Sequence, residues 1–255
     1  RRTRHRRGAR RMTVVLKLGG SVVTEKDTPD TVDGRALADA ADAIATSGVD
    51  DLVLVHGGGS FGHPHAAAHG VSRTDGTREA TAIREIHGAM RTLNDAVCDA
   101  LCERGVSAVP HHPHSAGVRD ADGTLSLPVD TVAAKRDEGF VPVLHGDVVT
   151  HVDTGATILS GDEIVVALAD GLDAERVGVC STVSGVLDDE GTVIPTIENY
   201  ADVERYLGGS DDTDVTGGMA AKVRSLLGLR APASVFGPDA VAAFLDGETP
   251  GTVIR

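Results

Sequence analysis

The sequence predicts an α/β fold in which helices cover both faces of a mainly parallel sheet. Short apolar runs typical of buried strands alternate with segments of helical periodicity along almost the whole chain. Several of these runs end at glycine-rich turns, as strands do where open α/β sheets bind ligands. No Pro/Ser-rich linker and no repeat divides the 255 residues. We therefore expect residues 12–255 to form one compact unit with two lobes.

The first half of the chain is expected to contain three strands and two helices. Apolar residues after Asp33 recur at intervals of three and four residues, which predicts a helix. Asp33 can cap its N-terminus. The longest helical pattern carries Ile83, Ile86 and Met90. In chain order the expected segments are a strand at 13–18, a helix at 33–48, a strand at 52–55, a helix from about 74 to 104 and a strand at 106–109.

The second half continues the alternation and adds a hairpin. Residues 148–159 alternate around Asp153-Thr154-Gly155, which is a turn signal. Because crossover helices connect parallel strands, the alternation predicts a parallel sheet. The expected segments are a helix at 130–138, a strand at 140–144, the hairpin, a helix opening at 160–162, a strand at 176–181, helices at 200–207 and 219–229, a strand at 233–236, a helix at 238–245 and a strand at 252–254.

Charge separates the first residues from the rest of the chain. Residues 1–11 carry seven arginines and no large apolar residue, so we expect a disordered extension that is not native to the fold, with a nucleic-acid-binding arm as the alternative. Without these arginines the formal net charge changes from −14 to −21. Such an acidic body argues against binding nucleic acid or an anionic membrane. No apolar run is long enough to predict a transmembrane helix.

The few lysines and cysteines are also informative. Aspartate is abundant while lysine occurs only four times, a composition that suits concentrated salt because salt screens self-repulsion. A lysine retained against this bias is expected to have a specific role. The three cysteines show no disulfide or zinc spacing, so we expect a cytoplasmic location without a signal peptide. A metal site at His111, His112 and His114 is an alternative, although histidines in a proline-broken loop are usually not ligands.

A glycine-rich loop follows the central strand and ends near a histidine. Glycines at 57–59 and 62 allow backbone N–H groups to approach a ligand, and phosphate is the usual occupant of such a loop. His63 could then donate to a phosphate oxygen. The spacing also matches the dinucleotide fingerprint, but the loop follows the second strand, and the segment about 20 residues later is helical in pattern rather than a strand ending in an acid. We therefore favour a phosphate site.

Lysines accompany the glycine-rich turns. Lys17 and Lys26 flank the turn at 19–21, and Lys222 follows the turn at 217–218 by one helical turn. Asp162, at a helix start, could orient the lysines or hold Mg²⁺. Lysines, oriented N–H groups and an aspartate are the groups that phosphoryl transfer requires, since that reaction depends on positioning and charge neutralisation. The Walker and protein-kinase motifs are absent.

Four motifs together resemble one superfamily. They are Lys17-Leu18-Gly19-Gly20-Ser21, His56-Gly57-Gly58-Gly59, Ser160-Gly161-Asp162, and Thr216-Gly217-Gly218-Met219 with Lys222. This set is similar to the amino acid kinase superfamily over residues 12–255 and implies a three-layer αβα sandwich. Gly59-Ser60-Phe61-Gly62-His63-Pro64 and Lys26 resemble the isopentenyl phosphate kinase family within it. With the acidic composition, the resemblance implies a halophilic archaeal source.

The resemblance also implies residue roles. The catalytic group would be Lys17, Lys26, His63, Asp162 and Lys222. ATP would be bound by Lys17, Gly19, Gly20, Ser21, Lys26, Gly59, Thr182, Ser184, Gly185, Val186, Gly218 and Lys222. The acceptor would be bound by Gly58, Gly59, His63 and Gly161, with Ile83, Ile86 and Met90 around its tail, unless these three are plain core. Thr182 stands where many relatives have aspartate, so the resemblance does not imply which residues bind the adenine or the ribose there.

The implied reaction is ATP-dependent phosphorylation of isopentenyl phosphate to isopentenyl diphosphate, a step of isoprenoid precursor synthesis in the archaeal mevalonate pathway. Mg²⁺ would be held mainly by the ATP phosphates rather than by protein ligands, and a homodimer is expected. Three alternatives stay open: a kinase acting on an amino acid or on a phosphonate such as fosfomycin, a non-catalytic ATP sensor, and a dinucleotide-dependent oxidoreductase.

Overall fold

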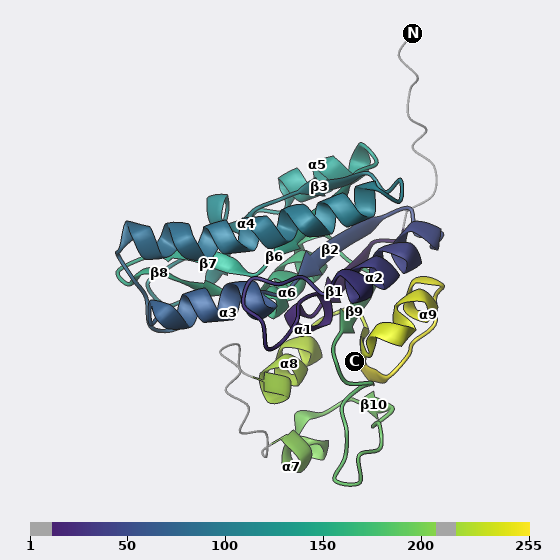
Figure 1. The fold of residues 1–255 in the computed structure, drawn as a ribbon. Coiled ribbons are helices and arrows are strands. Elements are labelled where there is room, and N and C mark those ends of the chain that lie inside the picture. Colours follow the sequence, from purple (N-terminus) through teal and green to yellow (C-terminus); the bar gives the residue numbers. More distant parts are fainter. Residues whose placement is uncertain (1–11, 208–217) are drawn as a thin grey trace.

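An eight-stranded sheet forms the centre of the structure, a computed structural model that describes residues 12–207 and 218–255 (Figure 1). The strand order is β10-β12-β11-β9-β1-β2-β6-β3, and only the β11–β12 pair is antiparallel. The predicted mainly parallel sheet is thus confirmed. Its strands are β1 (Val14–Leu18), β2 (Leu52–His56), β3 (Ala108–Pro110), β6 (Val141–His145), β9 (Arg176–Cys180), β10 (Thr196–Ile197), β11 (Ala233–Phe236) and β12 (Thr252–Ile254).

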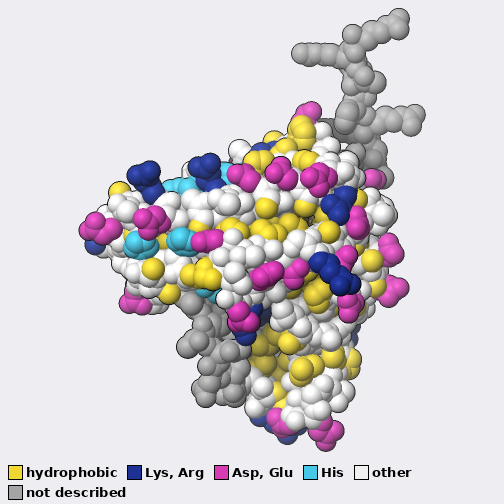
Figure 2. Space-filling view, viewed as in Figure 1, with side chains coloured by type: hydrophobic (Ala, Val, Ile, Leu, Met, Phe, Trp, Pro, Cys, Tyr) yellow, Lys and Arg dark blue, Asp and Glu magenta, His cyan; other side chains and the backbone are white. Residues whose placement is uncertain are grey.

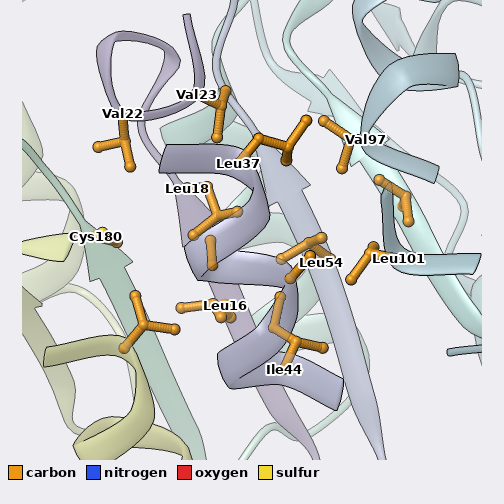
Figure 3. Packing of buried hydrophobic residues seen from close by; sticks show 14 of the residues in the cluster. Leu16, Leu18, Val22, Val23, Leu37, Ile44, Leu54, Val97, Leu101 and Cys180 are labelled. Atoms are coloured by element: carbon orange, nitrogen blue, oxygen red, sulfur yellow. The ribbon is translucent and has the colours of Figure 1, made fainter. Parts of the chain in front are cut away.

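Helices cover both faces of this sheet, as the αβα sandwich requires. One core cluster joins one face to α2 (Gly34–Thr46), α4 (Ala80–Cys102) and α9 (Val241–Leu245); its centre is shown in Figure 3. A second cluster joins the other face to α5 (Asp130–Asp137), α6 (Gly161–Gly171) and α8 (Gly218–Leu227). Strand β1 serves both clusters, because successive side chains of a strand point to opposite faces. Leu16 and Leu18 lie in the first cluster and Val15 in the second.

A smaller sheet packs beside the main one with the order β5-β4-β7-β8. The predicted hairpin is confirmed as β7 (Asp147–His151) and β8 (Gly155–Leu159). Its turn places Asp153 at φ 64° and Gly155 at φ 108°, in the left-handed region that aspartate tolerates and glycine favours. The partner strands β4 (Val118–Arg119) and β5 (Leu125–Ser126) were not predicted, since two residues are too few to show a period.

The expected loop after β2 is instead a helix, α3 (Gly59–Ala68), so His63 lies on a helix. Pro64 inside this helix has no N–H to give the carbonyl of Ser60, four residues earlier. The N–H of Asp30 donates to that carbonyl instead, at 3.1 Å. An external donor therefore satisfies the group that Pro64 leaves unpaired, which is why a helix can form across a residue that predicts its end.

Several smaller corrections concern boundaries and packing. Helix α4 begins at Ala80 rather than near residue 74, and a short α1 (Gly20–Val23) follows β1. Segments at 200–207 and 238–245 each begin with a 3₁₀ turn, at Tyr200–Asp202 and Pro238–Ala240, before α7 (Glu204–Leu207) and α9. The prediction for residues 1–11 lies outside the described ranges.

Lys135 on α5 is half-buried: its Nζ donates to the carbonyl of Pro110 at 2.7 Å, and burial lowers its pKa. Acidic side chains spread over the face drawn in Figure 2, consistent with the net charge of −14. Within the described ranges, no helix is both long and apolar enough to cross a membrane.

Candidate active site

One pocket of about 650 Å³ opens at the carboxyl ends of β1, β2 and β6. The last residues of these strands are in register across the sheet, and a glycine follows each: Gly19, Gly57 and Gly146. All three glycines line the pocket. The first residues of the helices α3, α6 and α8 line it too. Because helix N-termini present unpaired N–H groups and a positive dipole end, the pocket is suited to a polyanion.

The two glycine-rich turns at 19–20 and 57–59 pack backbone against backbone. A side chain at Gly20 would overlap the backbone of Gly59, and one at Gly57 would lie 2.5 Å from the nitrogen of Gly20. Gly59 also has φ +47°, a conformation that favours glycine. Thr24 ties the turns together, since its hydroxyl donates to the carbonyl of Gly20 at 2.9 Å and accepts from the N–H of Ser60 at 3.0 Å. The glycines are therefore required to bring both turns to one pocket.

Lys17 and Asp162 form an ion pair in the pocket wall. Nζ of Lys17 lies 2.6 Å from Oδ1 of Asp162, and Lys17 is 7% exposed. The side chain of Lys17 lies on the same face of the sheet as that of Val15, and α6 covers this face. Lys17 therefore points toward the start of α6. A Cβ at Gly161 would lie 3.0 Å from Cε of Lys17, so glycine there leaves room for the lysine stem. Burial alone would raise the pKa of Asp162, but Lys17 and Lys222 hold it below its usual value.

The start of α6 is fixed by a capping box. The Ser160 hydroxyl accepts from the N–H of Glu163 at 3.2 Å, and the Glu163 carboxylate accepts from the N–H of Ser160 at 3.0 Å. Buried Arg119 on β4 holds the same carboxylate at 2.8 Å. The small sheet therefore anchors the turn that carries Gly161 and Asp162.

The other predicted polar residues also reach this pocket. Lys26, exposed on the segment after α1, lines it, as does half-buried His63 on α3. A second hollow of about 460 Å³ shares Thr182 with the first. The predicted site residues that line one or both hollows are Lys17, Gly19, Gly20, Ser21, Lys26, Gly58, Gly59, His63, Ile86, Met90, Gly161, Asp162, Thr182, Ser184, Gly218 and Lys222.

Three predicted residues do not reach either hollow. Ile83 packs against a satellite core cluster with Ala66 and Val71. Val186 is fully buried in the core, and a Cβ at Gly185 would meet Thr252 Oγ1 at 2.7 Å, so both pack against the interior. In this structure none of these three residues therefore lines the pocket in which a ligand is expected.

An apolar part of the wall adjoins the glycine turn at 57–59 and the start of α3. Ile86 and Met90 contribute from α4, and Met90 Sδ would lie 2.9 Å from a Cβ at Gly62 and 3.4 Å from one at Gly58. Sequence reasoning missed the neighbouring wall residues Ala66, Gly146, Asp147, Ile158, Leu159, Ser181 and Met219. Gly146 and Asp147 follow a predicted strand, so the rule that sites form at strand ends could have found them. Ser181 and Met219 also carried a signal, because Ser181 ends a predicted strand and Met219 belongs to one of the four motifs. Ala66, Ile158 and Leu159 show none.

Buried histidines support the pocket floor. His56 and His145 end the neighbouring strands β2 and β6, with ring centroids 5.5 Å apart. In each, Nδ1 donates to the next residue's carbonyl, at 3.0 Å for His56 and 2.9 Å for His145. The side-chain amide of Asn94 donates to Nε2 of His56 at 3.1 Å. Burial and the nearby His145 lower the pKa of His56 to about 3, so this ring is neutral at physiological pH.

The pocket suits a nucleotide whose metal ion is held by its own phosphates. The lining residues include three lysines and two aspartates, Asp162 and Asp147. Asp162 is occupied by Lys17, and Asp147 by His87 at 3.0 Å. The wall therefore supplies cations and N–H donors for phosphate oxygens rather than the all-oxygen ligand set that Mg²⁺ prefers.

Comparisons with known proteins find relatives that match most of the chain. A sequence profile of the amino acid kinase family matches residues 12–229. The isopentenyl phosphate kinase of Haloferax volcanii is 65% identical over 243 residues, which cover 95% of this chain and 98% of that protein. The isopentenyl phosphate kinase of Methanothermobacter thermautotrophicus is 35% identical over 229 residues, covering 84% of this chain and 85% of that protein.

Solved structures share the fold over nearly the whole chain. X-ray structures of isopentenyl phosphate kinase include one that aligns with a TM-score of 0.78 at 26% identity, covering 95% of this chain and 100% of that one. A product complex of the T. acidophilum isopentenyl phosphate kinase aligns with a TM-score of 0.71 at 25% identity and the same coverage.

Proposed function

Because the chain belongs to the amino acid kinase family, we propose that it transfers the γ-phosphoryl group of ATP to isopentenyl phosphate, giving isopentenyl diphosphate and ADP. The relatives that match almost the whole chain are isopentenyl phosphate kinases. Their reaction needs a site that accepts two phosphorylated molecules, one of them with a short hydrocarbon tail. The pocket can be assessed against each of these requirements.

One observation carries the proposal: His63, the glycine turns and an apolar wall line the same pocket as the Lys17–Asp162 pair. Gly58 and Gly59 begin α3, and His63 lies one turn further along it. We propose that they bind the acceptor phosphate. Ile86 and Met90 border this turn on its apolar side and would enclose the tail. An acceptor with a charged end and a short apolar end fits this order of residues.

The lysines would make the transfer possible by neutralising charge. The acceptor phosphate oxygen is already anionic at neutral pH, so direct in-line attack needs no strong general base and no phosphoenzyme. We propose that Lys17, held in place by Asp162, contacts the transferring phosphoryl group. Lys222 and Lys26 would contact the ATP phosphates. Mg²⁺ bound to those phosphates would supply further charge neutralisation. The residues mainly overcome repulsion between two anions and align them.

We further propose a division of the pocket between its two lobes. The N-terminal lobe, with α3 and α4, would hold the acceptor, while the second hollow beside Thr182 and Ser184 would hold the nucleoside of ATP. The free cysteines 98, 102 and 180 fit a reducing cytoplasm. The resemblance also implies a homodimer, which sedimentation velocity can test.

Coupled detection of ADP tests the reaction directly. The purified chain is assayed with MgATP in high KCl against isopentenyl phosphate, fosfomycin, acetylglutamate, aspartate and UMP. We expect strong turnover with isopentenyl phosphate only, and confirmation of the diphosphate by mass spectrometry. Lys17→Met purified in the same way controls for contaminating kinases. Turnover with another acceptor, or ATP binding without turnover on any of them, would contradict the proposed substrate.

A further inference from the structure

We propose that His87, His114 and Asp147 form a binding site for one divalent transition-metal ion, separate from the Mg²⁺ that accompanies ATP. The three residues come from α4, the 3₁₀ turn Pro113–Ser115 and β7. One ligand atom of each lies within 4.8 Å of the others. Ligand atoms around a tetrahedral ion with bonds near 2.1 Å are roughly 3.4 Å apart. Small side-chain rotations therefore suffice to close the site.

The His114 ring is held in the form that a ligand needs. Its Nδ1 lies 2.7 Å from the carbonyl oxygen of Val148, which can only accept, so Nδ1 carries the proton. In the neutral ring, the lone pair is then on Nε2. A backbone carbonyl on the second nitrogen is a common way in which proteins orient a metal-binding histidine. His114 therefore has Nε2 available as a metal ligand before any ion binds.

Asp147 is likewise fixed before binding. Its side chain is fully buried, and Oδ1 accepts from the N–H of Val148 at 2.8 Å. Nδ1 of His87 lies 3.0 Å from Oδ2 and 3.1 Å from Oδ1 of the same carboxylate. The His87 and His114 rings approach to 4.5 Å between centroids. Two imidazoles and one carboxylate therefore converge, with a formal charge of −1 when both rings are neutral.

A second pair of histidines backs the site. Nδ1 of His145 donates to the carbonyl of Gly146 at 2.9 Å, so its Nε2 accepts from Nδ1 of His112, also at 2.9 Å. Nδ1 of His145 is 3.6 Å from Oδ2 of Asp147. These contacts restrain Asp147 from the side of the sheet. Figure 2 shows histidine side chains reaching the surface on the side of the molecule where α3 and the first turns of α4 lie in Figure 1.

The donor set selects the class of ion. Imidazole with carboxylate suits Zn²⁺ and its neighbours in the first transition row, whereas Mg²⁺ and Ca²⁺ prefer all-oxygen sites. A bound ion would link α4 to the segment after β3 and to β7. Asp147 also lines the pocket, so the ion would brace the wall behind the acceptor. The role that follows is structural stabilisation near the site, which goes beyond the proposed transfer reaction.

Cobalt provides a direct test, because bound Co²⁺ absorbs visible light according to its ligands. The full chain, freed of metal with a chelator, is titrated with Co²⁺ and then Zn²⁺ without nucleotide or prenyl phosphate. We expect saturation at one Co²⁺ per chain, the spectrum of a four- or five-coordinate ion, and displacement by Zn²⁺ but not by Mg²⁺. Zn²⁺ should also raise Tm, since it binds the folded chain.

Matched variants locate the ion. His114→Gln and His87→Gln should each weaken Co²⁺ binding by about tenfold or more and remove the rise in Tm. His65→Gln, on α3 and paired with Asp30, and His5→Gln should bind as the parent does. Circular dichroism of each variant checks folding. Absence of saturable binding, or loss of binding in the controls but not in His87→Gln and His114→Gln, would overturn the site. Neither result depends on the proposed reaction.

Discussion

Nζ of Lys17 lies 2.6 Å from Oδ1 of Asp162, although 145 positions separate the two residues in the chain. The contact joins the end of β1 to the start of α6 across the pocket. It explains why Asp162 stays ionised despite its low exposure, since Lys17 and Lys222 keep its pKa low. It also means that neither residue can be changed without leaving the other charge uncompensated.

Lys17→Met should lower kcat by about 10²- to 10³-fold, because a charge that stabilises the transferring phosphoryl group is lost. Lys17→Arg should not restore activity, since the space that Gly161 leaves fits the lysine stem and a guanidinium is larger than an ammonium. Steady-state kinetics with MgATP measure both effects. Lys135→Met is the matched control: its ammonium binds the Pro110 carbonyl and does not line the pocket. Full activity in Lys17→Met would contradict its role.

His63→Ala should act on the acceptor rather than on ATP. Loss of a hydrogen bond to a charged group typically costs about 1.5–3 kcal/mol, which corresponds to about 10- to 100-fold in kcat/KM for isopentenyl phosphate. The Kd of ATP, measured by calorimetry, should change little. His65→Ala, two positions along α3, should behave as the parent. An equal loss toward both substrates would show that His63 supports the pocket as a whole.

How much of the structure could be predicted from the sequence depends on how far apart the interacting residues lie in the chain. Strands such as Leu52–His56 are short apolar runs that alternate with helical patterns, so the parallel sheet was predictable. Helix α3 was not, because the donor that allows Pro64 comes from Asp30, a contact outside any local pattern. The glycine turns and lysines were predicted by motif, whereas His87, His114 and Asp147 share no spacing that marks a common site.

Met90→Ala should widen the pocket toward longer prenyl phosphates. Met90 borders Gly58 and Gly62 on the apolar side of the turn, so its truncation opens space where the acceptor tail is proposed to lie. We expect kcat/KM for geranyl phosphate relative to isopentenyl phosphate to rise about tenfold, within the 1–3 kcal/mol that apolar pocket contacts contribute to selectivity. Competition assays with both acceptors measure the ratio. Ile83→Ala, which removes core packing outside the pocket, should lower Tm without changing that ratio.

His56 should make the protein sensitive to mild acid. Burial, with a contribution from His145, lowers its pKa from 6.5 to about 3, against the opposing hydrogen bond to Gly57. Between these values the unfolded chain binds the proton and the folded chain does not. The free energy of unfolding should therefore fall as pH decreases from 6.5 toward 3, and be unaffected by this residue above pH 7. From pH 7.5 to 4.5 the loss is about 3 kcal/mol.

His56→Gln isolates this contribution, because an amide can accept from Asn94 and donate to the Gly57 carbonyl without titrating. Urea unfolding of both proteins at several pH values, at fixed ionic strength, gives the comparison. The variant is expected to be less stable at pH 7.5, yet to lose less stability than the parent on acidification. Carboxylate titration is common to both and cancels in the difference. Parallel curves for the two proteins would mean that His56 takes up its proton in the folded state, so that its buried contacts do not keep the ring neutral.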